Sequence, residues 1–97
     1  MAEGDVCRCS EELSKLLSSI GSAIALVAHE SWWSAKGALS EISEKLEAFE
    51  KCLGTRLGLE SILKKVEEEI EKERWFPAVA GLWTLLSELP LKLCKKR

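Results

Sequence analysis

Apolar side chains recur along this chain with the spacing of amphipathic helices. From residue 28 onward they alternate in steps of four and three, which lays one stripe along a helix; the stripe is Ala28, Trp32, Ala35, Leu39, Ile42, Leu46, Phe49 and Leu53. Gly54 follows it and suits a left-handed helix end. An earlier stripe has a different phase and consists of Leu13, Leu16, Leu17, Ile20, Ala23, Ile24 and Val27. Its helix is expected to have Ser10 as N-cap, followed by two glutamates in the first turn.

The two stripes do not join in phase, which predicts a break between residues 29 and 34. Neither glycine nor proline marks that break, so one continuous helix as far as Leu53 is the alternative. In the second half of the chain, a third helix is expected over residues 58–74. A fourth is expected from Pro77, because proline disfavours helix at the preceding residue and suits the first turn of a new helix.

A ten-residue segment of the chain nearly repeats after 43 residues. "ESWWSAKGAL" at 30–39 and "ERWFPAVAGL" at 73–82 share Glu, Trp, a second aromatic residue, Ala and Leu at matching places. This repeat predicts two similar helical hairpins that pack as an all-α, antiparallel four-helix bundle. The whole chain, 1–97, is expected to form one helical domain with an N-terminal arm at 1–9 and hairpins at 10–53 and 58–94.

Each hairpin turn is expected to carry a pair of aromatic residues. The pairs are Trp32 with Trp33, and Trp75 with Phe76. Aromatic rings have a large apolar area to bury. We therefore predict that these rings close the turns and are buried under the end of the bundle.

An up-down bundle places all four cysteines at one pole. Cys7 and Cys9 precede the first helix, Cys52 ends the second, and Cys94 follows the fourth. The favoured interpretation is two disulfides that join Cys7 and Cys9 to Cys52 and Cys94 in either order. The alternatives are a four-thiolate zinc site, a reactive thiol pair in "CRC", and four reduced thiols. Zinc is disfavoured because C-x-C is not the usual C-x2-4-C spacing.

The composition bears on how these cysteines are interpreted. The chain contains no Asn, Gln or Tyr, and its acidic residues are fifteen Glu and one Asp. Depletion of thermolabile amides with enrichment in Glu is typical of hyperthermophile proteins. Hyperthermophiles are also the organisms in which intracellular disulfides are common. The composition therefore favours a thermostable protein that carries disulfides.

Charge and hydropathy exclude several classes of partner. The net charge of −2 offers no general attraction for nucleic acid. The longest apolar run, residues 23–28, is far shorter than the roughly 20 residues that a membrane span needs. The N-terminal segment is acidic and lacks the apolar stretch of a secretory signal. We expect a cytoplasmic protein that binds neither nucleic acid nor a membrane.

The sequence contains no recognisable catalytic motif. His29 is the only histidine and falls where the first turn is expected, and no serine lies in a nucleophile elbow. "GTRLG" at 54–58 lacks the Lys-Ser/Thr of a phosphate loop. We therefore predict no enzymatic activity, no cofactor and no metal site.

The expected fourth helix carries a second apolar stripe beside its core stripe. This stripe is Val79, Trp83, Leu86 and Leu93, whereas the matching places in the second helix are Lys36, Ser40, Ser43 and Glu50. A helix that is apolar around most of its circumference is either more deeply buried than its counterpart or contacts another chain. The first helix adds a surface of small residues, Gly21, Ala25 and Ala28.

These features favour a protein-protein interaction or assembly module, stabilised by disulfides. The expected partner is a second copy, in a homodimer through the fourth helix, or an unidentified protein. One alternative is a thiol redox or zinc-binding protein that uses the cysteine pole. Another is a carrier of an apolar ligand between the helices.

Overall fold

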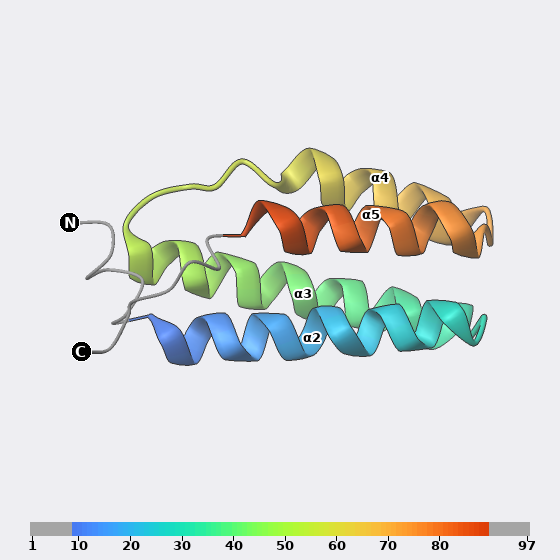
Figure 1. Ribbon diagram of the computed structural model, residues 1–97, viewed down its shortest axis with the longest axis horizontal. Coiled ribbons are helices and arrows are strands. Elements are labelled where there is room, and N and C mark those ends of the chain that lie inside the picture. Colours follow the sequence, from blue (N-terminus) through green and yellow to red (C-terminus); the bar gives the residue numbers. More distant parts are fainter. Residues whose placement is uncertain (1–8, 90–97) are drawn as a thin grey trace.

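The computed structural model describes residues 9–89, which form two helical hairpins (Figure 1). The helices are α2 (Ser10–Ala28), α3 (Trp32–Leu53), α4 (Glu60–Glu71) and α5 (Trp75–Glu88). Successive helices run in opposite directions, and each packs against two neighbours: α2 against α3 and α5, and α4 against α3 and α5. The predicted all-α, antiparallel four-helix bundle of two hairpins is confirmed.

The core lies where the predicted stripes meet. Leu17, Ile24, Trp32 and Leu53 of these stripes are only half-buried, and Ala28 is exposed. The core side chains named below are at most 7% exposed. All of them are apolar and recur at helical spacing, so each helix turns one face toward the core. They include Leu13, Leu16, Ile20, Ala23 and Val27 of α2, Ala35, Leu39, Ile42, Leu46 and Phe49 of α3, Val66 and Ile70 of α4, and Ala78, Leu82 and Leu85 of α5.

The first hairpin turns within three residues. α2 ends at Ala28 and α3 begins at Trp32, so the predicted break is confirmed and the continuous helix is wrong. Glu30 has a left-handed backbone, with φ of 58°. Its N–H donates to the carbonyl of Val27 at 2.9 Å, and the N–H of Ser31 donates to the carbonyl of Leu26 at 2.8 Å. These two bonds define a Schellman helix end.

The second hairpin repeats this turn 43 residues later. Glu73 has φ of 57°. Its N–H donates to the carbonyl of Ile70 at 3.0 Å, and the N–H of Arg74 donates to the carbonyl of Glu69 at 3.0 Å. A left-handed helix end is usually a glycine; here a glutamate takes that position in both turns. The first residue of each repeated segment, Glu30 or Glu73, is therefore the residue at which the chain reverses direction.

Replacing Glu30 or Glu73 by glycine is expected to raise the free energy of unfolding by about 0.5 to 1 kcal/mol each. The left-handed conformation costs a residue with a β-carbon about 1 to 2 kcal/mol, and the greater backbone freedom of glycine in the unfolded chain offsets part of the gain. Urea denaturation of the single variants measures the effect. Glu30→Ala is the control: it also removes the charge but keeps the β-carbon, so a gain as large as that of Glu30→Gly would contradict this explanation.

Several helix ends differ from the predictions. Cys9, not Ser10, is the N-cap of α2, and no side chain caps that end. α4 is shorter than 58–74 at both ends, and α5 begins at Trp75. Arg74 is extended and serves as N-cap of α5, so Pro77 falls in the first turn, where a missing N–H removes no helical hydrogen bond. Gly54 ends α3 with φ of 79°, as predicted.

Candidate functional site

A disulfide closes the first hairpin at the pole opposite its turn. Cys9 immediately precedes α2 and is completely buried, and Cys52 lies in the last turn of α3. Their sulfur atoms are 2.06 Å apart and their Cα atoms 5.9 Å apart. This pairing is one of those that the two-disulfide interpretation allows. Cys7 and Cys94 lie outside the described residues.

The zinc alternative requires all four cysteines as thiolates, and two of them are bonded to each other here. Within residues 9–89, no cluster of three or more His, Cys, Asp or Glu is placed to hold a metal ion. His29 is the C-cap of α2 and is exposed. The described part of the chain therefore offers no group of metal ligands for the zinc alternative.

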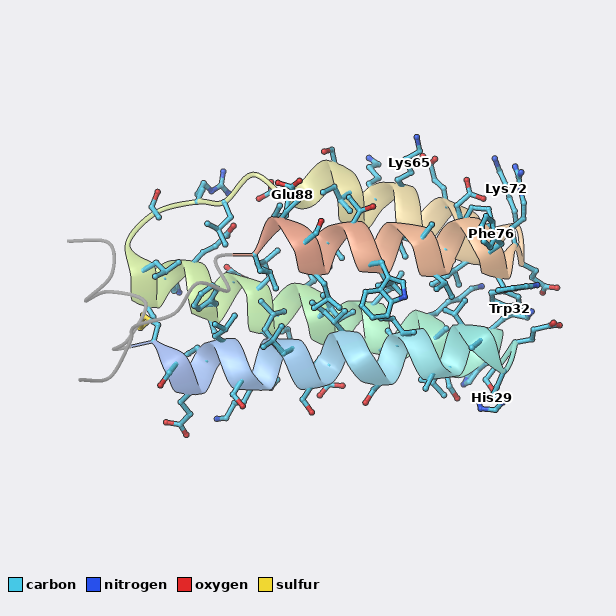
Figure 2. The ribbon with its side chains drawn as sticks, in the orientation of Figure 1. His29, Trp32, Lys65, Lys72, Phe76 and Glu88 are labelled. Carbon is cyan, nitrogen blue, oxygen red and sulfur yellow. A yellow bond between two sulfur atoms is a disulfide. The ribbon has the colours of Figure 1, made fainter. Side chains whose placement is uncertain are left out.

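The hairpin-turn aromatic residues lie where the repeat placed them, but the prediction that their rings are buried is wrong. The rings of Trp33, Phe76 and Trp75 are 88%, 68% and 48% exposed, and only Trp32 packs partly against the core. Figure 2 shows Trp32 and Phe76 at the turn end of the bundle. Each turn closes through backbone hydrogen bonds over three residues.

Charged side chains are divided unequally between the two sides of the bundle. α3 and α4 each carry seven, whereas α2 carries three and α5 carries one. The charges of α2 end at Lys15, and the single charge of α5 is Glu88. Residues 16–28 and 75–87 are consequently free of charge in a chain that is 31% charged overall. Since α2 and α5 are neighbours, these segments lie side by side (Figure 1).

The orientation of α5 follows from a close contact on one of its flanks. Gly81 lies so near Val66 of α4 that a β-carbon at Gly81 would overlap the valine side chain. This flank therefore faces α4. At 3.6 residues per turn, Val79, Trp83 and Leu86 fall on the opposite flank, toward α2.

The orientation of α2 follows in the same way. Ser19 and Ser22 line a hollow together with Glu41 and Lys45 of α3, so this flank faces α3. The opposite flank, toward α5, carries Leu17, Gly21, Ile24 and Ala28, and Ala25 lies next to it on the outer surface. We call the combined surface the α2/α5 face; it consists of Leu17, Gly21, Ile24, Ala25, Ala28, Phe76, Val79, Trp83 and Leu86.

The α2/α5 face brings together the described members of the predicted interface. Val79 and Leu86 are half-buried, and Trp83 is 58% exposed; Leu93 lies outside the described residues. The alternative was that the second stripe of α5 is buried within this bundle. It is wrong for Trp83, the largest side chain of that stripe. The small residues of α2 are visible in the sequence, but their position beside α5 is not a property of either helix alone. The sequence feature that could indicate it is the absence of charge from both segments, 16–28 and 75–87.

Comparison with models of known protein families, with curated proteins and with solved structures finds no match to this chain. Among the described residues, every helix is too short or too polar to cross a membrane. The fold defines an antiparallel bundle of two helical hairpins. Its most distinctive surface is the α2/α5 face.

Proposed function

We propose that this protein is a binding or assembly module whose contact surface is the α2/α5 face. One observation carries the proposal: the face contains no charged side chain, yet it exposes Trp83 and Phe76 by 58% and 68%. Contiguous exposed apolar surface on a small protein marks a site of interaction with another molecule.

The composition of the face supports a protein partner. The centres of protein interfaces are depleted in charged residues and enriched in aromatic ones, and buried tryptophans often dominate the binding energy. Trp83 lies between Val79 and Leu86 on a helix whose core stripe is buried. A side chain presented by a packed helix loses little freedom when a partner covers it.

The disulfide and the composition support a thermostable scaffold for this surface. Cys9 and Cys52 fasten α2 to α3, and the chain lacks Asn and Gln. These features fit a hyperthermophile protein that works in the cytoplasm, where such organisms keep disulfides.

Trp83→Lys is expected to lower the binding of the apolar dye bis-ANS by the dilute monomer several-fold, and to abolish association of the wild-type chain at higher concentration. A lysine at this position places a charge where an apolar partner surface would desolvate it. Fluorescence titration and sedimentation velocity over one dilution series give both readouts.

Trp33→Lys is the matched control. It makes the same substitution at a tryptophan that is even more exposed, at 88%, but lies on α3. The proposal requires that Trp33→Lys lowers neither dye binding nor association. Equal effects of the two substitutions, or no effect of Trp83→Lys, would refute the α2/α5 face as the contact surface.

A further inference from the structure

We infer that the α2/α5 face binds a second copy of this chain, related by a two-fold axis parallel to the helices, with Trp83 of each copy seated on Gly21 of the other. This inference rests on the proposed function and names its partner. Three properties of the face support it: the levels of the two residues along the bundle, the shapes of the two helices, and the distribution of charge.

Gly21 and Trp83 lie at about the same level along the bundle. α2 ends at Ala28 and α5 begins at Trp75. Both helix ends lie at the end of the bundle that carries the two hairpin turns (Figure 1). Gly21 is seven residues before Ala28, and Trp83 is eight residues after Trp75. At a helical rise of about 1.5 Å per residue, they lie about 10 Å and about 12 Å from these helix ends.

A two-fold axis parallel to the helices preserves these levels. An axis that lies in the contact plane, midway between α2 and α5, places α5 of one copy over α2 of the other and leaves the height of every residue unchanged. Trp83 of each copy then lies over Gly21 of its partner. The contact is made twice, as in every interface between two-fold-related copies.

The two helices have complementary shapes. On the α2/α5 face, α2 presents Gly21, Ala25 and Ala28, which are exposed and have little or no side chain. α5 presents the large exposed rings of Phe76 and Trp83. The aromatic rings on α5 of one copy therefore pack against the small residues on α2 of the other, and small residues allow two helices to approach closely.

Charge also favours a second copy as the occupant. Pairing two α2/α5 faces brings no charged side chain into the centre of the contact and leaves α3 and α4 of both copies in solvent. Two uncharged segments of about 20 Å, on helices 8 to 10 Å apart and each about 10 Å in diameter, give a face about 20 Å wide and about 400 Å² in projection. The smaller specific interfaces bury roughly 600 Å² per partner, and the exposed rings of Phe76 and Trp83 add to the accessible area of the face.

Substitution of leucine for glycine provides the test. No atom lies within 4 Å of a β-carbon built at Gly21 or at Gly37 of α3, and both positions are exposed, so leucine at either position is expected to extend into solvent in a single chain. Leucine also has the higher helix propensity, so neither variant is expected to unfold more readily than wild type. Gly21→Leu should weaken dimerisation at least about tenfold because it obstructs the partner's Trp83. Gly37→Leu, off the face, should leave dimerisation unchanged in sedimentation equilibrium.

A photo-crosslinker locates the contact directly. Trp83 is replaced by p-benzoylphenylalanine, and light and ¹⁵N-labelled chains are mixed before irradiation. The expected product joins position 83 of one chain to residues 17–28 of the differently labelled chain. A crosslink to another segment, or equal weakening by Gly21→Leu and Gly37→Leu, would overturn the inferred arrangement.

Failure of this inference can be told apart from failure of the proposed function. A chain that stays monomeric up to about 1 mM, but whose bis-ANS binding depends on Trp83, would overturn the second copy as partner and retain the face as a contact surface. Larger assemblies that depend on Trp83 would do the same. Dye binding and association that are both independent of Trp83 would overturn both.

Discussion

Replacing both Cys9 and Cys52 by alanine is expected to lower the free energy of unfolding by about 4 kcal/mol. The disulfide joins residues 43 positions apart and encloses α2 and all but the last residue of α3. Cross-linking a chain over such a span restricts the unfolded ensemble, and the loop-entropy relation gives about 4 kcal/mol for a loop of this length. Urea denaturation of the double variant and the wild type, in buffer without reductant, measures the difference.

Reducing conditions supply the control for this prediction. When the wild-type disulfide is reduced, both chains lack the cross-link, and their unfolding midpoints should nearly coincide. A difference that persists undiminished in reductant would show that the cysteine side chains stabilise the protein by packing instead. Equal stability without reductant would show that the cross-link is not formed in solution.

Phe49→Ala is expected to cost about 3 to 5 kcal/mol of stability. Phe49 is completely buried and is the largest side chain in the core. Removing a buried phenylalanine loses its transfer free energy and leaves a cavity that helices fixed by their neighbours fill only in part. Denaturant unfolding, monitored by far-UV circular dichroism, measures the loss.

The other phenylalanine of the chain provides the matched control. Phe76 is 68% exposed and contacts the ring of Trp75 edge to face, with ring centroids 5.7 Å apart. Phe76→Ala makes the same chemical change outside the core and should cost no more than about 1 kcal/mol. Similar costs at positions 49 and 76 would contradict the assignment of the core.

The core could be predicted from the sequence because it depends on spacing alone. The steps of four and three from Ala35 to Phe49 fix which face of α3 turns inward, and the structure buries that face. The break after Ala28 was visible as a change of phase. Its mechanism was not, because a glutamate with a left-handed backbone leaves no glycine or proline as a signal.

The aromatic residues and the contact surface show where sequence reasoning fails. The preference of aromatic rings for burial predicted a plug at each turn, but the backbone hydrogen bonds at Glu30 and Glu73 close the turns without one. The apolar stripe of α5 is evident from its own residues. The addition of Gly21 and Ile24 to the same surface is not, because it depends on α2 and α5 being neighbours in space.

The two hairpins repeat in backbone but not in charge, and this difference makes the molecule one-sided. Under the repeat, α2 corresponds to α4 and α3 to α5, and corresponding helices occupy diagonal corners of the bundle. Two identical hairpins could therefore not place uncharged helices at adjacent corners unless all four helices were uncharged. In this chain α2 and α5 carry three charged side chains and one, whereas α3 and α4 carry seven each. A bundle with a contact surface on two opposite sides could bind further copies at both and grow into filaments. A bundle with a contact surface on one side only can form a closed dimer with a second copy but cannot grow further.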